Sequence, residues 1–317
     1  MRFNDIVSLW FNAKKLCMDE VYTHKKRLEV FGHITPFFEG IHIEDINDVV
    51  LQCFATHEIE YGNRITHGPL SQNTVRREMQ TIKSIFAYAI AKGYTKVNPA
   101  AEINLKKIPP KEFEIYTTRE VAKLIEVARP KWLGDMILLA YHTGMRRGEV
   151  YGLQWHDIDF NRRRLSICRS IAAISPHEKF IHPPKTPSSR RSIYLDDVSV
   201  DMLWRRWLNR VSDTWVFANQ KGELMSPFYN VKYFRRACMV AGIPIRRFHD
   251  LRHSHITWLL MHNVPLKIVS ERAGHSSVSV TLDVYTHYIP SMQTLAVDAL
   301  NSSNEFFISP TADDDVV

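Results

Sequence analysis

Long apolar runs are missing from this 317-residue sequence: nowhere do about 18 or more apolar residues follow one another, so no transmembrane helix is expected. The N-terminal residues 1–5 lack the apolar core of a secretory signal. Cysteine is scarce, and no Cys-x-x-Cys pair is formed by the four that are present, Cys17, Cys53, Cys168 and Cys238. We therefore expect a cytoplasmic protein with four reduced thiols and no membrane contact.

Glycine and proline, at 12 and 15 residues, are too few for a fibrous or low-complexity chain. Apolar residues make up 45% and charged residues 24% of a length that favours about two domains. Charge is unevenly distributed, because residues 1–105 contain 12 Lys/Arg and 12 Asp/Glu, whereas residues 106–317 contain 29 and 22. The second part therefore carries the whole excess of +7, which suggests a polyanionic partner.

The first hundred residues have helical periodicity, and we predict helices over residues 4–18, 20–31, 44–59 and 72–92. The last of these has Ser71 as its N-cap and Gly93 as its C-cap. Its apolar residues are expected to face a core: Val75, Met79, Ile82, Phe86 and Ala89. Basic residues elsewhere on this helix usually form a solvated face, and a DNA-facing surface is the alternative for Arg76, Arg77 and Lys83.

Residues 104–116 have the composition of a linker, with two adjacent prolines and basic residues that include Lys106 and Lys107. A capping box formed by Thr117 and Glu120 then opens a second domain. We therefore predict a helical domain over residues 1–103 and a second domain over residues 117–290, followed by a C-terminal tail over residues 291–317.

The second domain is predicted to be mixed, with strands over residues 165–172 and 191–195 joined by a basic, proline-bearing loop. Helices are predicted around them, over residues 118–128, 131–142, 148–154, 197–210, 227–240, 250–262, 265–273 and 278–285. The expected fold class is a mainly α, two-domain protein, in which an N-terminal helical bundle precedes an α+β domain with a small antiparallel sheet.

Two motifs place arginine where it could present a fixed guanidinium to a phosphate. In Thr143–Glu149, glycines flank Arg146, and Glu149 follows three residues later; an ordinary ion pair at a helix start is the alternative. In FHDLRHSH, His249 and Arg252 are three apart and share a helix face. His249 and His253 are also spaced like zinc ligands, but no thiolate or carboxylate at ligand spacing completes a site, so no metal is expected.

The order of Arg146, Lys185, His249-x-x-Arg252, His275 and Tyr285 is more informative than any one of them. With the segments YHTGMRRGEVYGLQWHDID, PPKTPSSRRSIYL, FHDLRHSHITWLL and GHSSVSVTLDVYTH, this order resembles the tyrosine recombinases, the phage-type integrases. The resemblance covers about residues 115–290, and the helical first hundred residues are similar to the family's core-binding domain. It implies a site-specific DNA recombinase.

The resemblance implies that Tyr285 attacks a DNA phosphodiester, forming a 3′-phosphotyrosine and freeing a 5′-hydroxyl. Arg146 and Arg252 are then expected to bind the non-bridging oxygens, and Lys185 to protonate the leaving oxygen. The same resemblance gives His249 a part in proton transfer at the tyrosine.

The implied site is completed by a hydrogen bond from His275 to the phosphate and by Glu149, which supports the arginines. A phenol with a pKa of about 10 needs cationic neighbours to attack at neutral pH, and bidentate arginines suit the charge of the transition state. No cofactor is expected, because the phosphotyrosine keeps the bond energy and the sequence has no P-loop. Contacts with DNA are expected from Arg76, Arg77, Lys83, Lys106, Lys107, Arg190 and Arg191.

The implied partners are double-stranded DNA, three further copies in a homotetramer on paired recombination sites, and accessory DNA-bending proteins. Residues 290–309 have the pattern of an amphipathic helix that would pack on a neighbouring protomer, or on its own domain. Integrases of this family that bind accessory arm sites have an additional small N-terminal domain, whereas the core-binding-like helices here begin almost at Met1. A simpler recombinase and a chain trimmed of that domain are both compatible with the sequence. A type IB topoisomerase-like enzyme and a non-catalytic DNA-binding protein are the alternatives.

Overall fold

The computed structural model describes residues 1–103, 105, 114–184, 190–285, 297–298 and 300–301. The chain divides into two compact units, Met1–Glu112 and Phe113–Val317, each of which has its own hydrophobic core. Among the described helices, none has the length and apolar character needed to cross a membrane.

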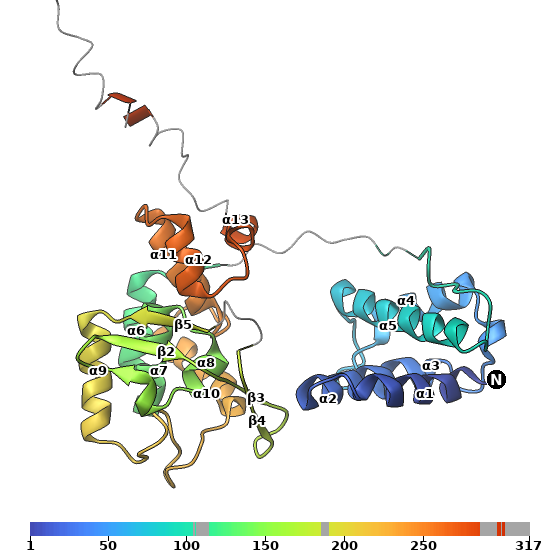
Figure 1. Ribbon diagram of the computed structural model, residues 1–317, viewed down its shortest axis with the longest axis horizontal. Helices are drawn as coiled ribbons and strands as arrows, with labels where there is room; N and C mark the ends of the chain where they lie inside the picture. Colours follow the sequence, from blue (N-terminus) through green and yellow to red (C-terminus); the bar gives the residue numbers. More distant parts are fainter. Residues whose placement is uncertain (104, 106–113, 185–189, 286–296, 299, 302–317) are drawn as a thin grey trace, which may run out of the picture. The chain divides into compact units, whose positions relative to one another are not determined.

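The N-terminal unit is helical (Figure 1). Its elements are α1 (Phe3–Lys15), α2 (Glu20–Glu29), the π-helical η1 (Val30–Ile34), α3 (Thr35–Phe37), the 3₁₀ turn η2 (Ile43–Asp45), α4 (Asp48–Tyr61) and α5 (Gln72–Ala91). The sequence predicted α1, α2, α4 and α5 to within a few residues, but it did not predict the π-helical turn that continues α2.

Helix α5 confirms the most detailed prediction made for this unit. The Ser71 side chain accepts a hydrogen bond from the backbone N–H of Thr74, and Gly93 has the positive φ of +78° that ends the helix. The predicted apolar face is buried at every position, from Val75 to Ala89. This face packs with α1, and Phe3, Phe38, Phe54 and Phe86 form the aromatic centre of the core.

Two carboxylates are buried against a histidine and an arginine in this unit. Glu58 and Glu78 are 0% and 1% exposed. His33 Nδ1 lies 2.8 Å from Glu58 Oε2 and 3.5 Å from Glu78 Oε1, and Arg64 Nη2 lies 2.8 Å from Glu58 Oε1. Among the described residues, Glu78 Oε2 has no hydrogen-bond partner. Burial raises the pKa of Glu78 to about 7, although the nearby His33 opposes this. The hydrogen bond to Glu58 raises the pKa of His33 in turn.

We expect the N-terminal unit to lose stability as the pH rises. Glu78 binds its proton more tightly in the folded unit than in the unfolded chain. Its contribution to the free energy of unfolding is therefore fully present below its unfolded pKa of about 4.5 and is lost as the pH rises through its folded pKa of about 7. The contribution of His33 is present below pH 6.5 and is lost as the pH passes its raised pKa. Core amides of α5 should therefore open more easily at pH 8 than at pH 5.5, by about 2 kcal/mol.

Amide hydrogen exchange of the full chain, corrected for intrinsic rates, measures this difference. Glu78→Gln should remove most of the pH dependence, whereas the exposed Glu60→Gln on α4 should leave it unchanged. Protection that increases between pH 5.5 and pH 8 would contradict the assignment.

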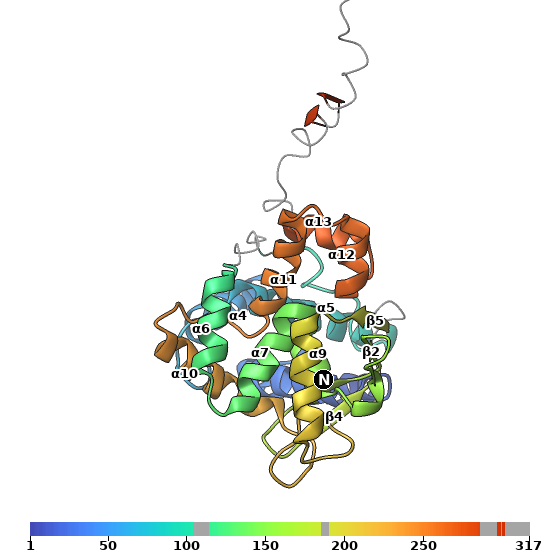
Figure 2. The ribbon, with the colours of Figure 1, turned by 90° about the vertical axis from the view of Figure 1, so that its left-hand side faces the viewer.

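The C-terminal unit is built from helices around two small antiparallel sheets (Figures 1 and 2). Its helices are α6 (Thr118–Val127), α7 (Lys131–Thr143), α8 (Arg147–Tyr151), α9 (Asp197–Leu208), α10 (Asn230–Ala241), α11 (Asp250–Met261), α12 (Leu266–Ala273) and α13 (Val278–Tyr285). The described residues also form the 3₁₀ turns η3 (Trp155–Asp157) and η5 (Pro227–Tyr229). The Thr117–Glu120 capping box is formed as predicted.

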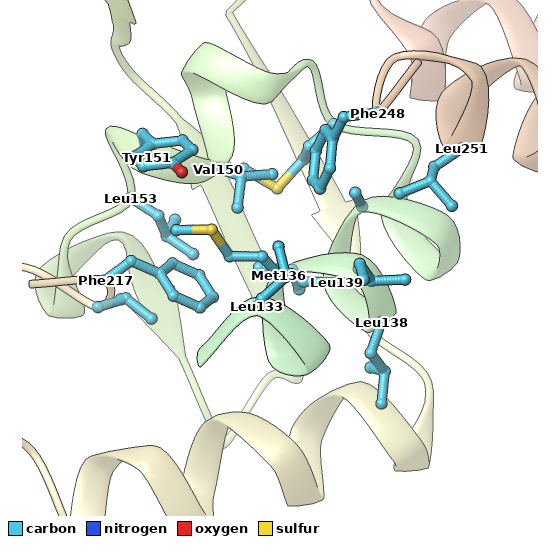
Figure 3. Packing of buried hydrophobic residues seen from close by; sticks show 14 of the residues in the cluster. Leu133, Met136, Leu138, Leu139, Val150, Tyr151, Leu153, Phe217, Phe248 and Leu251 are labelled. Atoms are coloured by element: carbon cyan, nitrogen blue, oxygen red, sulfur yellow. The ribbon is translucent and has the colours of Figure 1, made fainter. Parts of the chain in front are cut away.

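Helix α7 is the centre of this unit. Leu133, Met136 and Leu139 on α7 are fully buried, and Figure 3 shows them among Val150, Leu153, Phe217 and Phe248 from the surrounding segments. The buried face of α7 fixes the position of its C-terminal end, from which the chain turns into α8.

The sheets differ from the prediction of one strand over residues 165–172. Strands β1 (Ile158–Asp159), β2 (Arg164–Ile167) and β5 (Arg191–Tyr194) form one sheet, and β3 (Ser170–Ala173) and β4 (Lys179–His182) form another. The predicted strand is interrupted at Cys168 and Arg169. Arg169 is the cause, because its side chain turns inward to bind the buried Asp157 and donates to the carbonyl of Gly152.

Candidate active site

The first arginine is positioned by the tight turn between α7 and α8. Gly144 ends α7 with a φ of +67°, and Arg146 is the N-cap residue of α8. The Arg146 Nη1 donates to Glu149 Oε1 at 2.9 Å, and Nη2 donates to the carbonyl of Gly274 at 2.9 Å. The ion pair expected as the alternative is therefore present, but the same guanidinium also reaches the turn before α13.

Glu149 lies between two arginines. Arg191 on β5 approaches it with both terminal nitrogens, at 3.0 and 2.9 Å, and also donates from Nε to the carbonyl of Arg272. Burial opposes ionisation of Glu149, but the hydrogen bonds and charge of Arg191, together with the charge of Arg146, hold its pKa below the ordinary value. The carboxylate therefore organises both guanidinium groups.

The second motif arginine, Arg252 on α11, is 3% exposed. Its Nη1 donates to the carbonyl of Gly144 at 2.7 Å. Burial, followed by the nearby charge of Arg146, lowers its pKa to about 9. At neutral pH it still carries a positive charge close to two other arginines, with Glu149 as the shared acid.

Two guanidinium groups are paired with the buried Glu149 and the buried Arg252 lies close to them, so the desolvated cluster has an excess of positive charge. Burying unbalanced charge is costly unless an anion neutralises it. The cluster of Arg146, Arg191 and Arg252 around Glu149 is therefore suited to bind an anion with several oxygens, such as a phosphodiester.

Gly144, in the turn between α7 and α8, is required both by its backbone conformation and by the nearby side chain of His255. A Cβ at Gly144 would lie 2.6 Å from Cδ2 of His255, a buried ring that accepts a hydrogen bond from Arg272 Nε. Gly242 in the same unit has a similar φ of +64°, but nothing lies within 4 Å of its Cβ position. Alanine substitutions at the two positions therefore distinguish the cost of backbone strain, which both share, from the cost of a steric clash, which only Gly144 has.

We expect Gly144→Ala to destabilise the unit by about 2–4 kcal/mol and Gly242→Ala by about 1 kcal/mol. Gly144→Ala should also slow the DNA cleavage that the resemblance implies, by about tenfold or more, because the carbonyl that holds Arg252 is displaced. Urea unfolding and single-turnover cleavage measure the two effects. Equal destabilisation by the two alanines would show that His255 does not restrict the turn.

His275 lies directly after Gly274, which ends α12 with a φ of +68°. Its Nδ1 is 2.7 Å from Oγ1 of the buried Thr281. Burial, followed by the charges of Arg252 and Arg146, lowers the pKa of His275 to about 4. A neutral ring held through Nδ1 keeps Nε2 as its second hydrogen-bonding atom.

Tyr285 is the last residue of α13, which lies beside α11 and α12 at one end of the unit (Figure 2). Its hydroxyl oxygen lies 2.5 Å from Nδ1 of His253, and burial raises the pKa of this phenol. The histidine expected at the tyrosine was His249, but the structure places His253 there, with the ring of His249 edge-on to it at 5.1 Å between centroids. The four-residue spacing between His249 and His253 had suggested only a zinc-ligand pattern for His253.

The other expected site residues are distributed as follows. Lys185, Lys106 and Lys107 lie outside the described residues. Arg190 is exposed beside β5 and lines a shallow pocket with Cys168 and Ser192. Arg191 does not present its charge to the surface as expected, because its side chain is 6% exposed and is paired with Glu149.

The three basic residues of α5 belong to the N-terminal unit. Arg77 and Lys83 are exposed and Arg76 is half-buried. Lys83 donates to the carbonyl of Ala101 at 2.7 Å, so part of its hydrogen-bonding capacity is already used within the unit.

Among the described residues, one group of His, Cys, Asp and Glu has ligand atoms within 4.8 Å of one another, namely His33, Glu58 and Glu78 of the N-terminal unit. There the positive charge of Arg64 already balances Glu58.

Guanidinium groups around a carboxylate, with a buried tyrosine and histidines beside them, define a site for phosphoryl transfer to a phenol. Residues 115–291 match the phage integrase family, and residues 10–107 match the phage integrase SAM-like domain. The chain belongs to the phage integrase family, whose members are tyrosine recombinases, and it is a site-specific recombinase that cleaves and rejoins DNA.

Curated relatives are similar over most of the chain. A tyrosine recombinase XerC-like protein of Caldanaerobacter subterraneus subsp. tengcongensis is 30% identical over 290 residues, which cover 83% of this chain and 72% of the relative. The ICEBs1 integrase of Bacillus subtilis is 25% identical over 315 residues, which cover 94% and 82%.

Solved structures share the fold. The Tn1549 transposon integrase in complex with a circular intermediate DNA superposes with a TM-score of 0.77 at 17% identity, covering 93% of this chain and 99% of that one. A lambda integrase dimer bound to a core site superposes with a TM-score of 0.65 at 19% identity, covering 88% and 97%. The two-unit, mainly helical fold with small antiparallel sheets is therefore that of the integrases.

Proposed function

We propose that Tyr285 is the nucleophile of this recombinase and that it forms a 3′-phosphotyrosine with one DNA strand. The observation that carries the proposal is the excess of guanidinium charge around Glu149, in the same unit as a tyrosine whose hydroxyl is hydrogen-bonded to a histidine. An anion site alone would serve binding, but a phenol held by a base beside it serves covalent chemistry.

Each residue of the arginine cluster has a distinct part in this proposal. Arg146 and Arg252 bind the non-bridging oxygens and stabilise the charge that develops on them. Arg191 holds Glu149 ionised, and Glu149 keeps Arg146 in place. His275, fixed through Nδ1 by Thr281, donates from Nε2 to the same phosphate.

The leaving 5′-oxygen needs a proton, because an alkoxide leaves poorly. We assign this proton to Lys185, which the sequence places in the basic loop before β5. His249, whose ring lies against His253, contributes a further hydrogen bond to the phosphate.

Both units bind DNA in this proposal. We assign residues 1–103 to core binding, residues 104–116 to the linker and residues 117–290 to catalysis. Two domains on a basic linker form a clamp around the duplex, so each binds weakly alone and the whole chain binds tightly. Phosphate contacts are assigned to Arg76, Arg77, Lys83, Lys106, Lys107 and Arg190.

Four copies act together on two paired recombination sites. A lambda integrase tetramer bound to a Holliday junction superposes on this chain with a TM-score of 0.66 at 18% identity. We assign residues 291–317 to the contact between protomers, and accessory DNA-bending proteins to the bending of the paired sites. A topoisomerase-like enzyme would instead nick and reseal one duplex as a monomer.

Covalent trapping on DNA tests the proposal. The full chain is incubated with random-sequence duplexes that carry a nick, which lets the cleaved end diffuse away, and SDS-resistant complexes are collected and sequenced. Peptide mapping should find the DNA 3′-phosphate on Tyr285, and the selected duplex should support strand exchange between two copies. An adduct on another residue, or none, would refute the assignment.

A further inference from the structure

Tyr285 is enclosed by apolar side chains except at its hydroxyl. Its ring is 1% exposed and packs with Ile256 and Leu260 of α11 and Val269 of α12. At the polar end, the oxygen lies 2.5 Å from Nδ1 of His253, and the two ring centroids are 5.7 Å apart. This separation is at the short end of the hydrogen-bond range, where a proton can be transferred directly.

His253 is in the state that can accept such a proton. Desolvation by burial lowers its pKa to about 4, so at neutral pH the ring is uncharged and one nitrogen carries a lone pair. The charged and titratable groups around it include Asp250, which favours protonation, and Arg247 and Arg252, which disfavour it. The edge-on ring of His249 and, on the turn after α12, His275 are also close to it. Asp250 is itself engaged by Arg247 at 2.9 Å.

Burial lowers the pKa of His249 to about 4 as well, so the two histidines differ in geometry: the Tyr285 hydroxyl lies at Nδ1 of His253. His249 is the first residue of the His-x-x-Arg motif, but it lies just before α11, with an exposed side chain. His253 is one turn further along the helix, and a four-residue step places it on the same side of α11 as His249 but deeper in the unit. His249 therefore lies closer to solvent, whereas His253 lies further inside and contacts Tyr285.

We propose that His253 is the general base for Tyr285, a further catalytic residue of the recombination reaction. As the phenolic oxygen forms its bond to phosphorus, the phenolic proton moves to Nδ1 of His253 and produces an imidazolium. The bond between phosphorus and the 5′-oxygen breaks, and that oxygen takes its proton from Lys185. On rejoining, the imidazolium returns the proton to the phenol. This inference rests on the proposed role of Tyr285 as the nucleophile.

The test uses single-turnover cleavage of the selected duplex in two forms, with normal DNA and with a 5′-bridging phosphorothiolate, which leaves without a proton. His253→Gln keeps a polar side chain but cannot take the proton. We expect its cleavage rate to fall by about 10²–10³-fold on both substrates. Lys185→Ala should recover on the phosphorothiolate, and His262→Gln, an exposed histidine of the same unit, should behave as wild type on both.

The pH dependence separates a base from a structural residue. Without a base, attack requires a phenol that has already ionised, so the rate of His253→Gln should rise about tenfold per pH unit between about pH 7 and pH 9. The wild type should be nearly flat over that range, and His249→Gln should be slower but flat. A rate for His253→Gln within threefold (about 0.6 kcal/mol) of the wild type, or a loss that is equal at every pH, would overturn the proposal.

The protonation state of His253 can also be measured in the wild-type chain without DNA, so this test does not depend on whether His253→Gln folds. Nitrogen-15 resonances of the histidine rings in the wild-type full chain should report a neutral His253 with its proton on Nε2 at pH 7. The Nδ1 resonance should shift in Tyr285→Phe. An imidazolium at pH 7 would overturn the proposal, because a protonated ring cannot accept the proton. If the wild type formed no adduct on Tyr285, the proposed nucleophile would fail instead, independently of His253.

Discussion

Tyr285→Phe is expected to abolish the covalent DNA complex and strand exchange while leaving DNA affinity within about twofold of the wild type. Phenylalanine fills the same space among Ile256, Leu260 and Val269, so the fold should persist. Only the phenolic oxygen, which we propose forms the phosphotyrosine, and its hydrogen bond to His253 are removed. We expect the cleavage rate to fall below detection, by a factor of about 10⁴ or more.

Tyr194→Phe is the matched control, because this tyrosine is exposed on β5 of the same unit. It should cleave DNA at the wild-type rate. Denaturing gels measure the covalent complex, and gel shifts measure affinity under the same salt conditions, since phosphate contacts make binding salt-dependent. A 3′-linked adduct formed by Tyr285→Phe would assign the nucleophile to another residue.

Arg252→Met is expected to reduce the cleavage rate by about 10³-fold without reducing the stability of the DNA-free chain. Arg252 is buried beside Arg146 and Arg191, and burial lowers its pKa to about 9, which shows that the folded chain disfavours its charge. Methionine has a similar length and carries no charge to bury, so the DNA-free unit should gain or retain stability. In the proposed reaction the phosphate would lose a guanidinium donor, and the lower cleavage rate measures that loss.

Arg206→Met is the matched comparison with the opposite expectation. Arg206 donates to Asp135 at 2.7 Å and to the carbonyl of Val216 at 2.9 Å, and it lies over the ring of Phe217. Its removal should destabilise the unit by about 1–3 kcal/mol and leave cleavage unchanged. Urea unfolding and single-turnover cleavage of both variants make the comparison. If Arg252→Met destabilised the chain as Arg206→Met does, the arginine cluster would have a structural role.

Local signals were sufficient for most of the helical structure. Ser71 and Gly93 delimit α5, and Thr117 with Glu120 opens α6, because capping depends on residues three or four apart. The buried face of α5 follows from the helical period alone. The order of Arg146, Arg252, His275 and Tyr285 was likewise sufficient to indicate the family, since it does not depend on knowing any contact between them.

Contacts between distant residues were not predictable in this way. The strand predicted over residues 165–172 breaks because Arg169 pairs with Asp157, a residue twelve positions away that no local pattern links to it. From the sequence, Arg191 was expected to contact DNA as part of a basic loop. In the folded unit it is buried instead, because its side chain pairs with Glu149. The pair His33 and Glu78 is likewise joined only by the packing of η1 against α5.

The sequence by itself determined the helices, their caps, the division into a helical and a mixed part, and the set of residues available for phosphoryl transfer, because each depends on short spacing or on composition. Only the tertiary structure decided which histidine meets the tyrosine. His249 and His253 are one helical turn apart and share a side of α11, and it is the packing of α13 against α12, and of α12 against α11, that places the Tyr285 hydroxyl at His253. The contact between Tyr285 and His253, rather than His249, depends on how three helices pack. It therefore cannot be predicted from the spacing of residues within one helix.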